Sequence, residues 1–345
     1  MESQKCLPFF HPTTVLYVDD DRHLLSILPL RVGVSPYRCF HDPHDVLDCL
    51  ERGDVLTSLD LECWNRYTGE IGDPDCEGVL GLDKWTLYMR LFEPRRFDLA
   101  SVVVVDYAMP EMSGLTLCRR LAAWPCKRLL LTGRADLGLA VQAFNDGLID
   151  MFLSKEEPDL PAQVARAVRR LQYRYFLDTS RMMREFLARD DCALWADEVF
   201  SHLFARHCTD RGIVEYYAIN DPVGFLLIDA EGSGYLWLLF NDAQLESQCL
   251  SARQLGAPPG VLARLEGRTA ALFVGDPEGL TVLTPDQWHN ACLPISGIPG
   301  RPGQYYGITT RPDPIRLSPR AVVSFARYLE NADWLTERSE PRGTD

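Results

Sequence analysis

The chain has 345 residues, which at roughly 100–200 residues per domain predicts about two domains. Apolar residues make up 46% and charged residues 24% of it, a balance that excludes global disorder, a collagen-like chain and a small disulfide scaffold. The formal charge of −14 repels phosphate backbones and argues against a general nucleic-acid coat. The cysteines are scattered without Cys-x-x-Cys spacing, and no apolar run reaches the ~18–20 residues needed to cross a bilayer. We therefore expect a cytoplasmic protein with reduced thiols and no membrane contact.

Strand-like and helix-like stretches alternate along the first half of the chain. The strand-like runs are short and apolar, and they lie at 15–18, 37–40, 101–105, 127–131 and 151–153. The run at 101–105 contains four valines, so both of its faces are apolar, which is typical of a strand buried in a parallel sheet. Strands that alternate with helices predict right-handed βαβ units. We therefore predict an α/β domain with a parallel sheet over residues 13–158.

One stretch of the first half interrupts this alternation. Residues from about 52 to 97 contain a Gly-Glu-Ile-Gly-Asp-Pro sequence and mixed charge. A loop of this length without structure of its own is uncommon in a compact domain. We interpret 52–97 as an insertion before the third strand, with a helix at about 84–92.

A long helix is predicted after the first domain. The stretch 159–189 contains no glycine, and its one proline, Pro161, lies in the first turn, where a helix tolerates it. Its apolar residues recur in steps of mostly three and four, as in an amphipathic helix. We expect one linking helix over 159–189 that also joins two subunits; the alternative is two helices with a break near 178–180.

The second half of the chain predicts an α+β domain over 190–335. The elements expected in it are helices at 193–207, 242–255 and 321–329 and strands at 213–219, 225–230, 235–240, 270–274 and 304–309. The Glu-Gly-Ser-Gly sequence at 231–234 separates two apolar runs, which is a hairpin signal and predicts antiparallel pairing. The polar residues 336–345 are expected to form a flexible tail.

Carboxylates and a lysine follow the predicted strands of the first domain. Asp19 and Asp20 follow the first strand, Asp106 the third and Lys155 the fifth, while Thr132 follows the fourth. Because the active residues of parallel α/β sheets lie at the carboxyl ends of the strands, we expect these side chains to meet at one edge. The carboxylates would repel one another without a hard cation, and Mg²⁺ takes oxygen ligands of this kind. The residues therefore predict a magnesium site with a carboxylate nucleophile.

Four segments of the sequence resemble the receiver domain of two-component response regulators. They read Val-Leu-Tyr-Val-Asp-Asp-Asp at 15–21, Val-Val-Val-Val-Asp-Tyr-Ala-Met-Pro-Glu-Met-Ser-Gly at 102–114, Leu-Leu-Leu-Thr-Gly at 129–133 and Phe-Leu-Ser-Lys at 152–155. The resemblance covers residues 13–175 apart from the insertion. It implies a flavodoxin-like (βα)5 fold with the strand order 2-1-3-4-5.

The resemblance implies a role for each residue at this edge. Asp106 is the expected phosphoacceptor, and Lys155 and Thr132 are expected to contact the phosphoryl group. Thr132 and Phe152 are the expected switch residues. One departure concerns the lysine, which in the family is normally followed by a cis-proline, whereas Glu156 follows Lys155 here. Without proline a cis bond would cost about 2.5–4 kcal/mol, so the position of Lys155 is open.

The resemblance also implies a set of metal ligands. Asp20 is the expected direct ligand of Mg²⁺, and Asp19 is expected to act through a water molecule. The carboxylate of Asp106 and the backbone carbonyl of Ala108 complete the expected protein ligands.

By the same resemblance we expect a response regulator that accepts a phosphoryl group from a sensor histidine kinase and forms a homodimer. It would be no enzyme beyond its own phosphoryl transfer and dephosphorylation. Residues 190–335 show neither a helix-turn-helix pair nor a cyclase or phosphodiesterase signature, so DNA binding is not expected. Their layout is similar to the response regulators of α-hydroxyketone quorum-sensing clusters, which have an atypical α/β output domain. We expect this domain to bind an effector protein or a small ligand.

Two alternatives for the output domain remain open. It could be a ligand- or nucleotide-sensing module with a pocket lined by Trp237 and Tyr217, although these aromatic side chains also suit the core of the domain. The protein could instead be a transcriptional regulator with unusual DNA contacts. Such contacts would come from a basic strip on the long helix, formed by Arg166, Arg169, Arg170 and Arg174.

Overall fold

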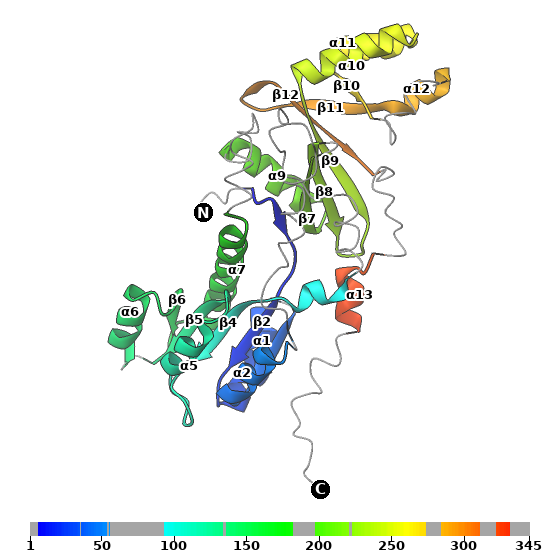
Figure 1. The fold of residues 1–345 in the computed structure, drawn as a ribbon. Helices are drawn as coiled ribbons and strands as arrows, with labels where there is room; N and C mark the ends of the chain where they lie inside the picture. Colours follow the sequence, from blue (N-terminus) through cyan, green and yellow to red (C-terminus); the bar gives the residue numbers. More distant parts are fainter. Residues whose placement is uncertain are drawn as a thin grey trace, which may run out of the picture. The chain divides into compact units, whose positions relative to one another are not determined.

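The chain folds into two compact units (Figure 1). The parallel unit comprises His11–Leu61, Glu93–Arg181 and Phe325–Asp345, and the antiparallel unit comprises Met1–Phe10, Glu62–Phe92 and Met182–Ser324. The computed structural model describes residues 6–34, 36–53, 55, 93–133, 136–181, 197–220, 223–273, 284–310 and 322–331. The helix expected at about 84–92 and the tail 336–345 lie outside these residues. No helix among the described residues is long and apolar enough to span a bilayer.

The parallel unit is built on a five-stranded parallel sheet with the order β3-β2-β4-β5-β6. Its strands are β2 (Thr14–Val18), β3 (Tyr37–Phe40), β4 (Ala100–Asp106), β5 (Lys127–Thr132) and β6 (Met151–Ser154). Numbered within the sheet alone, this order is 2-1-3-4-5, the flavodoxin-like order of receiver domains. The predicted fold class of the first half is therefore confirmed.

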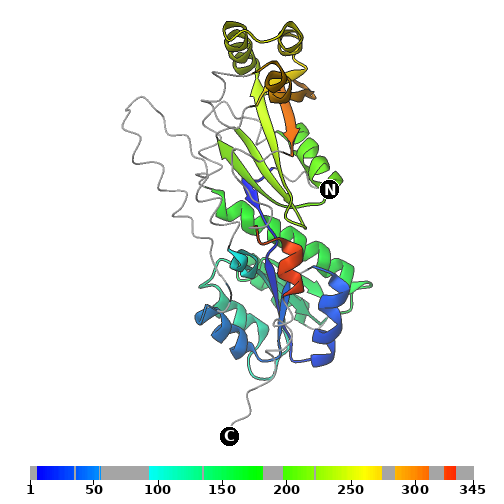
Figure 2. The same cartoon turned by 90° about the vertical axis from the view of Figure 1, so that its right-hand side faces the viewer.

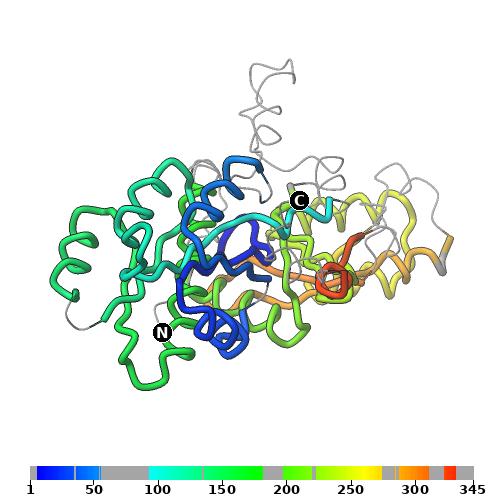
Figure 3. The backbone as a smooth tube through the Cα atoms, turned by 90° about the horizontal axis from the view of Figure 1, so that it is seen from below, coloured from blue at the N-terminus to red at the C-terminus, as the bar shows by residue number. Residues whose placement is uncertain are grey.

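Helices cover both faces of this sheet (Figure 3). They are α1 (Arg22–Val32), α2 (Pro43–Glu51), α5 (Gly114–Leu121), α6 (Leu137–Asn145) and α7 (Leu160–Thr179). The valines of β4 alternate between the two faces: Val103 and Val105 belong to the core with α2 and α5, and Val102 and Val104 to the core with α1 and α7. This explains why the strand reads as a continuous apolar run.

Local signals in the sequence begin several of these helices. The carboxylate of Asp21 accepts hydrogen bonds from the backbone N–H groups of His23 and Leu24 at the start of α1. Asp42 caps α2 in the same way, with Pro43 at the first helical position. A left-handed glycine, Gly33, ends α1 with a φ of 64°.

Helix α7 corrects the prediction of one continuous helix over 159–189. It ends at Thr179, and the N–H of Ser180 bonds back to the carbonyl groups of Phe176 and Asp178, so the break lies where the alternative placed it. Val164, Val168 and Leu171 are fully buried in the core of the parallel unit. The helix therefore covers the sheet as the last helix of the parallel unit, and the described part of 159–189 is more than a linker.

The antiparallel unit contains a seven-stranded sheet with the order β1-β7-β8-β9-β12-β11-β10, in which every pair is antiparallel. The strands are β1 (Phe9–Phe10), β7 (Ile213–Asn220), β8 (Val223–Asp229), β9 (Gly234–Asn241), β10 (Ala270–Leu272), β11 (Cys292–Ile298) and β12 (Arg301–Thr309). The hairpin expected at 231–234 joins β8 to β9, with Ile228 opposite Gly234. A mixed α/β second domain with antiparallel strands is therefore confirmed.

Helices also pack in the antiparallel unit. They are α9 (Glu198–Asp210), α10 (Asp242–Gln254), α11 (Pro259–Glu266) and α12 (Pro285–Ala291), and Figure 2 shows α10 and α11 beyond one end of the strands. Helix α9 lays Phe200 and Phe204 on Trp237 of β9, with ring centroids 5.4 and 4.9 Å apart. This aromatic layer forms part of the core of the unit.

Both ends of the chain cross between the units. The first strand, β1, pairs with β7 in the antiparallel sheet and precedes β2 of the parallel sheet by only three residues. Helix α13 (Phe325–Glu330), which we expected in the domain 190–335, belongs to the parallel unit. The simple division into 13–158, 159–189 and 190–335 therefore does not give the exchange of segments between the two units.

Candidate functional site

The residues singled out from the sequence meet at the carboxyl edge of the parallel sheet. Asp106 is the last residue of β4 and lies beside Leu131 of β5, while Thr132 ends β5 beside Ser154 of β6. Asp19 directly follows β2, and its N–H bonds to the carbonyl of Phe40 at 3.1 Å, which keeps it on the sheet. The parallel register thus brings the strand ends together.

Lys155 lies between two of these carboxylates. Its Nζ is 2.8 Å from Oδ2 of Asp19 and 2.8 Å from Oδ1 of Asp106. The two aspartate side chains are each only 6% exposed, and the lysine side chain is 28% exposed. The N–H of Lys155 donates to the carbonyl of Thr132 at 2.8 Å, so the backbone of β5 fixes where the lysine begins.

The departure at Glu156 does not move Lys155 away from the site. Ser154 closes the turn that follows β6, because its Oγ accepts from the N–H of Glu156 at 3.3 Å and its carbonyl from the N–H of Glu157 at 3.1 Å. With this turn and with glutamate in place of proline, the lysine reaches both carboxylates.

Burial and charge oppose each other at this site. Burial raises the pKa of Asp19, the hydrogen bond from Lys155 lowers it, the neighbouring Asp106 raises it again, and the net shift is upward. For Lys155, burial alone would lower the pKa, but the hydrogen bonds and charges of the two carboxylates outweigh it, so the net shift is also upward. Lys155 therefore stays charged, and the carboxylates of Asp19 and Asp106 lie close together in a partly desolvated site.

The carboxylates suit a hard divalent cation. Asp19, Asp20 and Asp106 each offer an oxygen within 4.8 Å of the others, and Asp20 is exposed to solvent. Carboxylate oxygens combined with room for water are the ligands Mg²⁺ takes in proteins. The donor set therefore fits the predicted metal. Ala108 lies two residues beyond Asp106 and is exposed. The role of its backbone carbonyl as a metal ligand stays a prediction.

The two expected switch residues lie on β5 and β6, the strands that end at the acidic edge. Thr132 is fully buried, and its Oγ1 donates to the carbonyl of Gly133 at 3.2 Å. Phe152 is half-buried, with its ring centroid 6.2 Å from that of Phe144 on α6. Their part in switching stays a prediction.

Gly114 is a residue of the site to which we assigned no role from the sequence. A Cβ atom built on it would lie 2.1 Å from the carbonyl oxygen of Asp106, a distance that real structures do not show. Its N–H also donates to the carbonyl of Tyr107 at 2.9 Å, so the start of α5 lies directly against the backbone of the acidic residue. The signal was present in the motif, where a glycine stands eight residues after Asp106.

The aromatic side chains of the antiparallel unit lie in its core. Trp237 is 0% exposed and stacks on Phe200 with an interplanar angle of 8°. Tyr217 is also buried, and its hydroxyl donates to the carboxylate of Glu215. Among the described residues these contacts favour a packing role for Trp237 and Tyr217. The four arginines of the basic strip are exposed on α7.

Comparison with solved structures gives a match over nearly the whole chain. The Legionella pneumophila response regulator LqsR has a similar structure, with a TM-score of 0.75 and 27% sequence identity over 95% of this chain and 96% of that chain. The chain has the architecture of a response regulator. No family model matches the sequence.

Two shorter matches cover only a part of this chain. The C4-dicarboxylate transport transcriptional regulatory protein DctD of Rhizobium meliloti (strain 1021) is 38% identical over 71 residues, which are 20% of this chain. The chain spans only 15% of the length of that curated relative. The signal receiver domain of a putative Luxo repressor protein from Vibrio parahaemolyticus matches 48% of this chain, at 18% identity and a TM-score of 0.32.

Proposed function

We propose that the protein is a cytoplasmic, phosphorylation-dependent response regulator in which Asp106 accepts a phosphoryl group from a sensor histidine kinase. One observation carries this proposal: Lys155 Nζ lies 2.8 Å from the carboxylates of both Asp19 and Asp106. This arrangement supports a nucleophilic role for Asp106, because a charged lysine and two further carboxylates lie close to it at one partly exposed edge.

The residues of the edge have separate tasks in the transfer. A carboxylate oxygen of Asp106 forms the new O–P bond while the N–P bond of a phosphohistidine on the kinase breaks, and the histidine nitrogen keeps the electron pair. Lys155 neutralises the added charge and orients the phosphoryl oxygens, and the Thr132 hydroxyl would leave the carbonyl of Gly133 to donate to one of them. Mg²⁺, held by Asp19, Asp20, Asp106 and the carbonyl of Ala108, would screen the repulsion between carboxylate and phosphoryl group. We propose no enzymatic activity beyond this transfer and the dephosphorylation of Asp106, in which water takes the phosphoryl group and the carboxylate is restored.

The added phosphoryl group is expected to act through a two-state rearrangement. Thr132 and Phe152 would shift together, and the surface around α6, β6 and α7 would repack. We propose that this shift changes a homodimer, since two-fold pairing is the commonest symmetry of soluble oligomers.

For the antiparallel unit we propose binding of an effector protein or a small ligand in a quorum-sensing type of pathway. The buried positions of Trp237 and Tyr217 favour a protein partner over a ligand cage built from these two residues. DNA binding by the exposed arginines of α7 is the competing proposal. It predicts binding that weakens steeply with salt, whereas undetectable binding at low salt would remove it.

A phosphorylation experiment on the full chain tests the proposal. The protein is treated with a small-molecule phosphoryl donor and Mg²⁺, and its intact mass and its size by light scattering are compared for wild type, Asp106→Asn and Asp146→Asn. Asp146 is an exposed carboxylate at the end of α6 and serves as the matched control. We expect one added phosphoryl group in wild type and in Asp146→Asn and none in Asp106→Asn. Equal labelling of Asp106→Asn would refute the assignment of the phosphoacceptor.

A further inference from the structure

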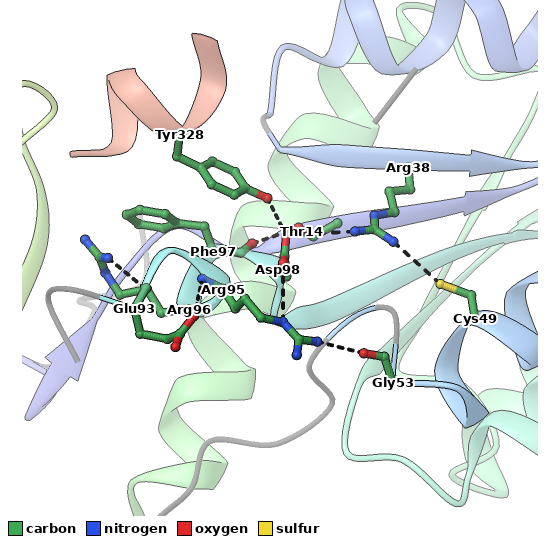
Figure 4. A network of polar contacts seen from close by, with 10 residues as sticks. All are labelled: Thr14, Arg38, Cys49, Gly53, Glu93, Arg95, Arg96, Phe97, Asp98 and Tyr328. Atoms are coloured by element: carbon green, nitrogen blue, oxygen red, sulfur yellow. Dashed lines mark hydrogen bonds and ion pairs between the residues drawn. The ribbon is translucent and has the colours of Figure 1, made fainter. Parts of the chain in front are cut away.

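A polar network in the parallel unit holds the last described helix, α13, on the residues that precede β4 (Figure 4). The hydroxyl of Tyr328 donates to Oδ1 of Asp98 at 2.6 Å, and both side chains are buried. Burial and the bond to Asp98 raise the pKa of Tyr328, so the hydroxyl remains a donor at any ordinary pH. This is a buried hydrogen bond to an acidic side chain, and hydrogen bonds in which one partner is ionised are stronger than those between two neutral groups.

Aromatic contacts surround this bond. The ring of Phe97 is fully buried and lies 5.2 Å from the ring of Phe325 and 5.1 Å from that of Tyr328, measured between centroids. The guanidinium carbon of Arg96 lies 4.0 Å from the centroid of Phe97. The carbonyl of Phe97 in turn accepts from Oγ1 of Thr14 at 2.8 Å. The docking surface for α13 is thus connected to the first residue of β2.

The docking surface is made by the residues at which the chain re-enters the parallel sheet after the insertion. The short 3-10 helix η2 (Pro94–Asp98) supplies Phe97 and Asp98. Its Arg95 donates through Nη2 to the carbonyl of Gly53 at 2.7 Å, and Arg95 N–H bonds to Glu93 at 3.0 Å. The residue that follows the end of α2 and the residues that precede β4 are therefore tied together beside the site that receives α13.

Asp98 is the centre of this network. Besides Tyr328, its carboxylate has Arg38 of β3 at 3.9 Å and Arg95 at 4.0 Å. These two distances are at the limit for an ion pair, whereas the tyrosine bond is short. The hydroxyl of Tyr328 is therefore the closest described partner of a carboxylate that is itself almost fully buried.

We propose that α13 is a releasable C-terminal clasp that docks on Phe97 and Asp98 and opens without unfolding the parallel sheet. The helix has six residues, fewer than the ~12–15 an isolated helix needs in water, so its helical form depends on docking. Tyr328 is its one buried residue, and Arg327, Leu329 and Glu330 are exposed. Segments with so few buried contacts open at much lower cost than the core.

The position of the clasp in the chain gives it a function. Ser324 is the last residue of the antiparallel unit, and α13 follows it directly. A docked α13 fixes the end of that unit's chain to the parallel unit, in addition to the other points at which the chain passes from one unit to the other. Opening releases the segment that follows Ser324 from the parallel unit. The clasp lies at the amino-terminal ends of β2 and β4, away from Asp19 and Asp106, and does not depend on phosphoryl transfer.

Hydrogen exchange of the full chain, read by mass spectrometry, tests the clasp. Tyr328→Phe removes the donor and leaves the Asp98 carboxylate without its closest partner, which costs roughly tenfold in the docking equilibrium. We expect amides within 325–331 to exchange about tenfold faster, while those of β4 keep the wild-type rate. Tyr305→Phe is the matched control, because Tyr305 donates to Asp242 at 3.2 Å on the exposed surface of the antiparallel unit. It should leave 325–331 unchanged.

Two results would overturn the clasp. One is wild-type exchange of 325–331 in Tyr328→Phe, which would show that the buried bond does not hold the helix. The other is equal acceleration in 325–331 and β4, which would make α13 a part of the core that opens only with the sheet. If Tyr328→Phe does not fold, Phe325→Leu replaces it with the same readout, since it removes the ring contact to Phe97.

Discussion

Gly114 should be among the least replaceable residues of the parallel unit. In Gly114→Ala the new Cβ would lie 2.1 Å from the carbonyl oxygen of Asp106 and 2.9 Å from the Cα of Tyr107, where ordinary contact begins at 3.4 Å. The oxygen would have to retreat by about 1.3 Å, the difference between 3.4 Å and 2.1 Å. Because the obstructing atoms are backbone, no side-chain rotation relieves the overlap. We expect a loss of about 2–3 kcal/mol in the stability of the unit, after a gain of up to ~1 kcal/mol in helix propensity.

Gly138→Ala is the matched control for this substitution. Gly138 lies inside α6, and a Cβ there would meet no atom within 4 Å, so the same exchange should stabilise the unit by about 0.5–1 kcal/mol. The assay is hydrogen exchange of the amides of β4, which reports on the parallel unit alone. We expect exchange about 30- to 150-fold faster in Gly114→Ala and slower than wild type in Gly138→Ala. Wild-type exchange in Gly114→Ala, or equal damage by both substitutions, would refute this account of the close approach.

Three further predictions concern charge and packing. Asp19→Asn should stabilise the protein by about 1 kcal/mol at pH 7 without divalent cations, because it removes a buried charge next to Asp106. Since the pKa of Asp19 is raised in the folded state, the folded wild type takes up a proton at Asp19 before the unfolded chain does, and the stability advantage of the variant should shrink as the pH falls. Urea denaturation at several pH values measures this. Lys155→Met should destabilise the protein by about 1–3 kcal/mol. Burial lowers the pKa of Lys155, but its two carboxylates outweigh burial and raise the pKa in the folded state. The loss should therefore be present in full below the ordinary lysine pKa near 10.4 and fade at higher pH. Phe204→Ala should lower the free energy of unfolding by about 3–5 kcal/mol in thermal or urea denaturation. Val199 on the same helix is 46% exposed, so Val199→Ala should cost less than ~0.5 kcal/mol. Equal effects of the two substitutions would contradict the packing role of the aromatic layer.

The acidic edge could be predicted from the sequence because its signals are local and strong. The four valines before Asp106 specify a strand that is buried on both faces, which, together with the alternating helices, is typical of a parallel sheet. Once the strands are parallel, Asp19 and Asp106 must emerge at the same edge, whatever the details of the helices. The hairpin at 231–234 was predictable for a similar reason, since glycines between two apolar runs leave few other conformations.

Elements fixed by distant contacts could not be predicted in this way. Strand β11 contains Pro294, Ser296 and Gly297, which argue against a strand, and yet it pairs with β12 and β10 in the sheet. Strand β1 has only two residues and forms because β7 offers it an edge. Helix α13 is too short to signal itself and depends on Asp98, a residue 230 positions away in the sequence. In each case a tertiary partner outweighs the local propensity.

The same two strands connect the acidic edge to a second polar layer at their other ends. There, Thr13 shares a hydrogen bond of 2.6 Å with Ser101 and accepts one of 3.0 Å from Gln172 of α7, and all three side chains are buried. Beyond Thr14, which donates to the carbonyl of Phe97, the side chains of β2 and β4 between the two layers are apolar except for Tyr17, whose buried hydroxyl has no partner among the described residues. No chain of side-chain hydrogen bonds therefore runs along the strands. The acidic edge therefore has no polar relay along β2 and β4, and the close backbone approach of Gly114 to Asp106 ties the end of β4 to the start of α5 instead.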